Sequence, residues 1–459
     1  MMGNFDWPLF AVYVLFLIMG IATVYSTAYD AEHPNLFDFS QKYGKQIVWV
    51  GVSLFLGLLV YLIDSEIYRI FAIPIYVAVL SLLVIVLFMP AVNGAHAWLG
   101  IGSMGIQPAE FAKIGTAILL AKYLDSLNLK QQNIKTIFVS SGIVLLPMAL
   151  ILLQPDAGTF IVFTAFLFVM YREGVTFDPI VLRFVNLMPG VKFKQTWLGS
   201  HFIPIMFVVV FLSVTTLLLS SKTFELTILP GVEISAFWAL FFFLFVFCLL
   251  GYFFLRLILP LREKKHAIII SLIAFGFAAG LAGTVNTGFQ KLASHQKDRI
   301  ELVLGLREDP DGDDYNRNRA MASVGSGGLF GKGYGQGSLA KVESNHVPES
   351  ETDFIFCPFA EEWGFVGSIT LVSLYLFMLL RIIKIAERQR AVFNRVYAYS
   401  VAMILFYHFA INIGMNIEFA PVIGIPLPFF SYGGSSMMSF SIMLFILLKL
   451  DSQRKDVLN

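Results

Sequence analysis

The chain has 459 residues, of which 57% are hydrophobic and 14% are charged; its mean hydropathy is +0.76 and its formal net charge is +1. Soluble domains carry roughly a quarter charged residues, so this composition excludes an ordinary soluble globule. The near-neutral charge excludes a nucleic-acid-binding protein that relies on a basic surface. Cys248 and Cys357 provide neither a disulfide framework nor a CxxC metal motif. The class that remains is an all-α polytopic integral membrane protein.

Apolar runs of about 20 residues, long enough to cross a bilayer, occur about twelve times along the chain. The first run lacks the basic start and the small-residue cleavage site of a signal peptide, so we expect it to remain as a transmembrane helix. The fourth is the least regular, because it contains Glu110, Lys113 and Lys122. The predicted spans are 8–27, 46–64, 70–89, 108–124, 136–153, 158–172, 203–220, 235–258, 267–288, 365–384, 396–417 and 434–450.

Lysine and arginine in short loops indicate the cytoplasmic side of a membrane protein. With about twelve spans and the N-terminus inside, the basic segments all fall in the cytoplasm: 173–202, 259–266, 385–395 and 449–459. The segments that then fall outside are 90–108, 154–158, 289–364 and 418–434. The outer segments hold most of the glycine, proline and polar clusters, so we expect chemistry at the extracytoplasmic face. The alternative is that they are only connecting turns.

Several polar residues stand out within or beside the predicted spans. Glu110 and Lys113 are three residues apart, hence on one helix face, and we expect them to pair inside the bundle. Asp156 follows a proline and opens a predicted span, a pattern typical of a helix N-cap. Trp98 could contact a sugar or a lipid headgroup, or it could serve as an interfacial anchor.

The long outer segment has three chemically different parts. Residues 295–300 are basic, and Arg299 could meet a lipid phosphate. Residues 308–315 contain five acids; they form either a cation loop or a solvated turn, and they lack the spacing of an EF-hand. Residues 325–337 contain seven glycines around Lys332, which predicts either a backbone cradle for an anion or a flexible tether.

An acidic cluster, 348-PESETDFIF-356, immediately precedes an apolar segment. It contains Glu349, Glu351 and Asp353. A carboxylate at the mouth of a cavity and backed by a hydrophobic helix should have a raised pKa, as a general base requires. The alternative is an interfacial acid that marks the start of the helix.

Several whole strings resemble one known family, the SEDS proteins of bacterial cell-wall synthesis (shape, elongation, division, sporulation). They include PESETDFIFCPFAEEWGFVG and NIGMNIEFAPVIGIPLPFFSYGGSSM, and the matching blocks are 94–114, 154–159, 309–337, 348–367 and 412–437. The sequence GSGGLFGKGYGQG is more similar to the RodA (elongation) branch than to the FtsW (division) branch. The resemblance implies a peptidoglycan glycosyltransferase that polymerises lipid II and releases undecaprenyl diphosphate. It also implies a site on the outer face of the bacterial cytoplasmic (inner) membrane.

The resemblance further implies roles for individual residues. The essential acid of the family maps to Asp353, its tryptophan to Trp98, and its membrane Glu and Lys to Glu110 and Lys113. We expect the other substrate-binding residues to be Gln107, Asp156, Arg299, Lys332, Glu349, Ser431 and Tyr432. This sequence departs from the family where Glu351 replaces a histidine, Ala97 replaces an arginine, and Asn345 replaces an acid.

The expected organisation is an N-terminal SEDS part, an insertion and a C-terminal SEDS part. Their bounds are 1–172, 173–266 and 267–459, and the last part includes the large outer loop 289–364. The insertion holds about two spans beyond the ten expected of the family. Because that number is even, the site stays on the outer face.

The resemblance implies a class B penicillin-binding protein and elongation-complex membrane proteins as partners. A divalent cation, Mg²⁺ or Mn²⁺, is left open as a cofactor. Two other functions are considered, a lipid II flippase or transporter and a non-catalytic scaffold for a penicillin-binding protein. The charged and glycine-rich material gathers on one face instead of at the bilayer midplane, which disfavours a transport path.

Overall fold

The computed structural model describes most of the chain, and it divides into two compact units. The first comprises Met1–Ser200 and Tyr315–Asn459, and the second comprises His201–Asp314. The described residues are 5–29, 33, 35–90, 96–100, 105–127, 133–185, 201–220, 223–225, 233–258, 264–291, 297, 301, 313–342, 347–420 and 422–454.

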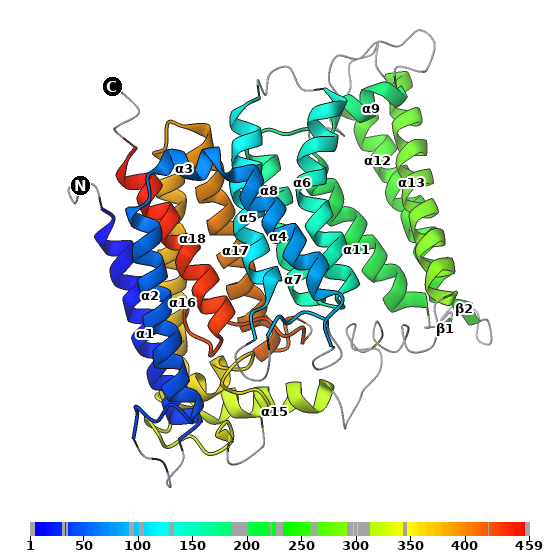
Figure 1. The fold of residues 1–459 in the computed structure, drawn as a ribbon. Coiled ribbons are helices and arrows are strands. Elements are labelled where there is room, and N and C mark those ends of the chain that lie inside the picture. Colours follow the sequence, from blue (N-terminus) through cyan, green and yellow to red (C-terminus); the bar gives the residue numbers. More distant parts are fainter. Residues whose placement is uncertain are drawn as a thin grey trace. The chain divides into compact units, whose positions relative to one another are not determined.

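Helices make up nearly all of the regular structure, as predicted (Figure 1). Those that lie in the first unit or end in it are α1 (Trp7–Thr27), α2 (Lys42–Leu62), α3 (Ser65–Ile70), α4 (Ala72–Val86), α5 (Pro108–Asp125), α6 (Ile134–Leu153), α7 (Ala157–Phe163), α8 (Ala165–Arg172), α9 (Asp178–Val185), α15 (Asp313–Ser326), α16 (Phe356–Glu387), α17 (Val392–Asn416) and α18 (Gly434–Ser452). The second unit holds α11 (Phe202–Ser220), α12 (Ala236–Ile258) and α13 (Lys264–Gln290).

One small sheet departs from the all-helical prediction. Strands β1 (Thr223–Glu225) and β2 (Glu233–Ser235) pair antiparallel just before α12. Phe224 lies opposite Ile234 in this pair. Two strands of three residues each close the turn between α11 and α12, and they leave the fold class unchanged.

Eight helices in the described parts of the chain are long and apolar enough to cross a membrane: α1, α2, α6, α12, α13, α16, α17 and α18. Three shorter apolar helices, at Ala72–Val86, Ala157–Arg172 and Ile203–Leu219, fall on predicted spans. The predicted span 108–124 falls on α5, whose Glu110, Lys113 and Lys122 lower its hydropathy. The chain is therefore an all-helical, multi-pass membrane protein.

The helix starts follow from local side chains. Asp6 caps α1, because its Oδ1 accepts from the backbone N–H of Leu9 at 3.2 Å. Asn133 and Thr136 form a reciprocal capping box at the start of α6. Helix α16 begins at Phe356, before the predicted span 365–384, and continues through a backbone break at Gly364 (φ 63°, ψ −162°).

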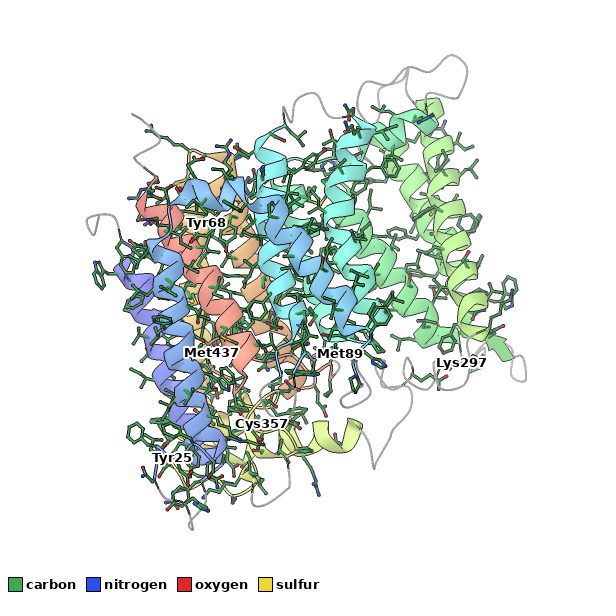
Figure 2. The ribbon with its side chains drawn as sticks, viewed as in Figure 1. Tyr25, Tyr68, Met89, Lys297, Cys357 and Met437 are labelled. Atoms are coloured by element: carbon green, nitrogen blue, oxygen red, sulfur yellow. The ribbon has the colours of Figure 1, made fainter. Side chains whose placement is uncertain are left out.

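The core of the first unit is built around α17 and α18. Helix α18 packs against α2, and α17 packs against α5 and α16. The loops that precede α2, α5, α7 and α18 lie at the same end of this unit as α15 (Figure 1). Figure 2 shows Cys357, in the first turn of α16, at that end and Tyr68, in α3, at the opposite end.

Arginines at the end opposite α15 are paired with acids. Arg395 binds Glu173 at 2.8 Å, and Arg381 binds Asp6 at 3.0 Å. Arg388 joins Asp6 to a second buried acid at the end of α18, Asp451. Arg388 and Arg395 of the predicted cytoplasmic segment 385–395, together with Arg381 at the end of the preceding span, thus tie the helix ends together.

Candidate active site

The acidic segment before α16 folds into a tight turn. The N–H groups of Thr352 and Phe354 both donate to the carbonyl of Glu349 at 3.1 Å, and Glu349 itself adopts a left-handed backbone (φ 51°). The Ser431 hydroxyl donates to the Thr352 carbonyl at 2.6 Å. The Tyr432 N–H donates to the Glu351 carbonyl at 2.9 Å. These bonds attach the turn to the loop that leads into α18.

A buried asparagine on α17 holds the backbone of Asp353. The Nδ2 group of Asn412 donates to the Asp353 carbonyl at 2.8 Å and to the Ile425 carbonyl at 2.7 Å. Gly424 has a left-handed backbone (φ 64°), and a Cβ added there would lie 3.3 Å from Asp353 Oδ2. The carboxylate therefore lies beside a residue without a side chain, while its backbone is fixed by α17.

Asp156 reaches the same loop from the N-terminus of α7. Its Oδ1 accepts from the Thr159 N–H at 2.9 Å, which confirms the predicted helix cap. Its Oδ2 accepts from Gln107 Nε2 at 2.8 Å, just before α5. A Cβ on Gly158 would lie 2.7 Å from the Ile423 carbonyl oxygen, so α7 approaches the loop very closely. The ends of α5, α7, α17 and α18 thus converge around one acidic turn.

The surroundings of Asp353 shift its ionisation towards neutral pH. Burial, together with the negative charges of Glu349 and Asp156, raises the pKa of the Asp353 carboxyl to about 7. By surface exposure its side chain is half-buried. A carboxyl with such a pKa is partly ionised at neutral pH and can accept a proton there, which suits a general base.

A buried charge network lies deeper in the bundle. Lys113 Nζ donates to Glu110 Oε2 at 2.8 Å, so the predicted pair is present, and it also contacts His408 Nε2 at 2.8 Å. His408 Nδ1 lies 3.2 Å from the carbonyl oxygen of Pro426, which can only accept. The imidazole therefore carries its proton on Nδ1 and accepts from Lys113 through Nε2. His408 was not among the predicted site residues, although an ionisable residue within a predicted span signals a functional role.

Lys332 of the glycine-rich segment and the backbone that directly follows this segment bind an anion, and that anion is part of the protein. The buried Glu361 carboxylate accepts from Lys332 Nζ at 2.6 Å. It also accepts from the backbone N–H groups of Ser338, Leu339 and Ala340 at 2.8, 3.0 and 2.9 Å. The segment is packed on the start of α16, so it is not a free tether, and Lys332 already has a partner.

Gly331 offers a direct test of this packing. Its backbone is left-handed (φ 80°), and a Cβ would lie 2.1 Å from the Glu362 carbonyl oxygen. We expect Gly331→Ala to destabilise the packed segment by more than about 1 kcal/mol and to speed tryptic cleavage after Lys332 several-fold. Gly325→Ala is the matched control, because a Cβ there meets nothing within 4 Å. Equal cleavage rates in the two variants would contradict the packing.

Glu351, which departs from the family pattern, has a structural partner. It is buried and forms an ion pair with Lys42 at the start of α2. Gln46, one turn further along α2, donates to the Ser431 carbonyl at 3.2 Å. Helix α2 is thus attached both to the acidic turn and to the loop that leads into α18.

The remaining predicted site residues are placed as follows. The structure brings Gln107, Asp156, Glu349, Ser431 and Tyr432 around the turn that carries Asp353, and Glu349 is exposed there.

Trp98 is 38% exposed and lies beside the short bridge between Leu99 and Ile106. Arg299 and residues 308–312 lie outside the described residues. Within the described part of the chain, no group of three His, Cys, Asp or Glu side chains could hold a metal ion.

Comparison with known proteins identifies the family. Residues 6–193 and 246–456 match the family FTSW_RODA_SPOVE, described as cell cycle protein. This chain belongs to that family. The SEDS resemblance of the individual strings is therefore confirmed over most of the chain.

Similar proteins align with this SEDS chain over nearly its full length. It is 30% identical to the peptidoglycan glycosyltransferase RodA of Treponema pallidum, over 98% of each chain. It is similar in fold to a chain from a peptidoglycan synthase complex (TM-score 0.65, 23% identity, 99% of each chain). It is also similar to the rod shape determining protein RodA of Thermus thermophilus (TM-score 0.55, 22% identity, 99% of each chain). The fold is thus RodA-like.

Proposed function

We propose that this SEDS protein is a peptidoglycan glycosyltransferase that polymerises lipid II into glycan strands during cell-wall elongation and rod-shape maintenance. Family membership and the activity named for the Treponema relative support the reaction class. The sequence of the glycine-rich segment and the name of that relative favour the elongation branch. The observation that carries the proposal is the half-buried Asp353 carboxyl, with a pKa of about 7, held where four helix ends converge.

In the proposed reaction, Asp353 accepts the proton of the acceptor sugar's 4-hydroxyl as that oxygen attacks the anomeric carbon of the donor. The new glycosidic bond forms, and the bond from the anomeric carbon to the diphosphate oxygen breaks. Undecaprenyl diphosphate leaves with the electron pair. Asn412 and Gly424 orient the base, and the outer loops exclude part of the bulk water.

The growing charge on the leaving diphosphate needs cationic or N–H donors. Lys332 is paired with Glu361, so it contributes only if that pair opens. Arg299 is the second candidate. A divalent cation is the third, since Mg²⁺ is commonly held by one or two carboxylates together with substrate phosphates. The exposed Glu349 beside Asp353 fits such a partial ligand set, and a bound cation would neutralise charge on the phosphates.

Chelation tests the cation. We expect EDTA to abolish polymerisation of purified lipid II and added Mg²⁺ or Mn²⁺ to restore it. Full activity in EDTA would show that protein donors alone stabilise the charge of the leaving diphosphate.

We further propose that all twelve predicted spans cross the bacterial inner membrane, with the N-terminus in the cytoplasm and Asp353 on the extracytoplasmic face. The arginine-rich end opposite α15 supports this orientation through the positive-inside rule. Residues 194–245 are not matched by the family, which supports an insertion within 173–266 that adds two spans to a SEDS core.

A class B penicillin-binding protein is the proposed partner, together with other elongation-complex membrane proteins. The similar chain of known structure belongs to a complex that coordinates polymerisation and crosslinking. That observation favours a partnership over an isolated enzyme.

Two assays on the purified chain test the proposed function. Incubation with lipid II should yield glycan strands on a gel, with and without the transpeptidase partner. Reconstitution in liposomes should give no lipid II scrambling above the lipid background. Lipid II scrambling without glycan strands would favour the flippase. The absence of both activities, with and without the partner, would favour the scaffold.

The pH dependence of the rate tests the role assigned to Asp353. The base acts in its ionised form, so the rate should fall as pH decreases through about 7, the pKa of Asp353. Glu349→Gln removes one negative neighbour, lowers the pKa of Asp353 and should move this acid limb to lower pH. Glu66→Gln, an exposed acid of α3 at the opposite end, should leave it in place. An acid limb of the pH profile that does not move in Glu349→Gln would argue against Asp353 as the base.

A further inference from the structure

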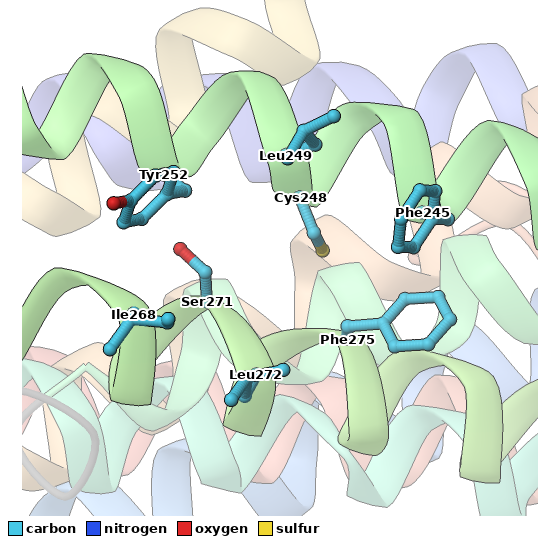
Figure 3. Close-up of a pocket in the computed structure, with 8 residues that line it drawn as sticks. All are labelled: Phe245, Cys248, Leu249, Tyr252, Ile268, Ser271, Leu272 and Phe275. Atoms are coloured by element: carbon cyan, nitrogen blue, oxygen red, sulfur yellow. The ribbon is translucent and has the colours of Figure 1, made fainter.

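A groove of about 260 Å³ lies between α12 and α13, within the second unit (Figure 3). Phe245 and Phe275 close one end, Tyr252 and Ile268 lie at the other, and Cys248 lies between them. Its lining is almost entirely apolar. Such a lining offers few hydrogen-bond partners, and burying a polar group without them is costly, so this groove fits a hydrocarbon chain better than a polar metabolite.

A cation lies at the Tyr252 end of the groove. Arg256, in the last turn of α12, is exposed, and its Nη1 donates to the Tyr252 hydroxyl at 3.3 Å. Tyr252 lines the groove, so Arg256 places a positive charge next to one end of an apolar surface.

We propose that this groove holds an acyl chain of an anionic phospholipid whose headgroup lies beside Arg256. A Lys or Arg at the membrane surface attracts an anionic headgroup by about 1 kcal/mol, whereas a zwitterionic headgroup gains little. The apolar lining holds the chain, and Arg256 selects the headgroup. With the membrane orientation proposed above, this lipid belongs to the cytoplasmic leaflet.

Native mass spectrometry of the full-length protein in detergent measures the binding. With added phosphatidylglycerol, the wild type should retain lipid about fivefold more tightly than with phosphatidylcholine. Arg256→Gln should lose this preference. Ser271→Trp fills the groove and should weaken retention of phosphatidylglycerol several-fold, because the acyl chain loses its packing against the lining.

Two matched variants control for surface effects. Lys384→Gln removes an exposed cation from the last turn of α16, and Leu250→Trp enlarges an exposed face of α12 outside the groove. Neither should change retention. The unmodified chain supplies a second measurement, because Cys248 lines the groove while Cys357 is buried. Phosphatidylglycerol should slow alkylation of Cys248 by a maleimide, and phosphatidylcholine should not.

Three results would overturn the proposal. The first is equal retention of both phospholipids by the wild type, and the second is unchanged retention in a folded Ser271→Trp. The third is tighter retention of undecaprenyl phosphate than of phosphatidylglycerol, which would assign the groove to the substrate lipid. These readouts do not use polymerase activity, so they remain valid whether or not the proposed reaction is correct.

Discussion

Asp353→Asn should lower the rate of lipid II polymerisation by about 10²–10⁴-fold, the range that a general base contributes. Asparagine keeps the size of the side chain and loses the basic oxygen. Because the backbone bond from Asn412 does not involve the side chain, the acidic turn should keep its position. The measurement is the rate of glycan formation from purified lipid II, resolved on a gel.

The same protein samples provide the control for folding. Replacing a carboxyl that lies beside Glu349 and Asp156 removes like-charge repulsion, so the unfolding midpoint in detergent should not fall. Glu66→Gln should polymerise like the wild type. Polymerisation by Asp353→Asn within about threefold of the wild type would remove Asp353 from the role of base.

Lys113→Met should destabilise the protein by about 3–5 kcal/mol, because it leaves the carboxylate of Glu110 buried without its cation. It also removes the donor to His408 Nε2. The expected result is a strongly lowered unfolding midpoint in detergent and a reduced yield in the membrane. The measurement is the unfolding free energy of the purified protein.

A double variant separates the lost charge pair from lost packing. Glu110→Gln combined with Lys113→Met removes both charges of the buried pair. The double variant should therefore recover most of the stability that Lys113→Met loses. Lys384→Gln, on an exposed surface, should stay within about 0.5 kcal/mol of the wild type. A single Lys113→Met variant as stable as this control would contradict the stabilising role assigned to the ion pair of Glu110 and Lys113.

Local patterns in the sequence were enough to predict the local features of the site. The spacing of Glu110 and Lys113 predicted their pair, and the residues around Asp156 predicted its cap. Hydropathy predicted the helices, because one apolar run decides one span. The acidic turn before α16 was also predicted as a candidate, since charge next to an apolar run is visible without a fold.

Contacts between distant parts of the chain could not be predicted in this way. Asn412 holds Asp353 across 59 residues, and nothing in its neighbourhood signals that partner. The glycine-rich segment was expected to bind a ligand or to act as a tether, yet its Lys332 and the N–H groups that directly follow it bind Glu361. Backbone amide groups can bind any nearby anion. The sequence of the segment therefore does not show which anion the packing of the fold places beside them.

Asn412 has a consequence for inhibition. One amide group joins α17 to both the carbonyl of the proposed base and the loop at Ile425. A compound that captured this amide with a carbonyl of its own would take the donor away from Asp353 and from Ile425 together, so it would release the proposed base and the loop in one step.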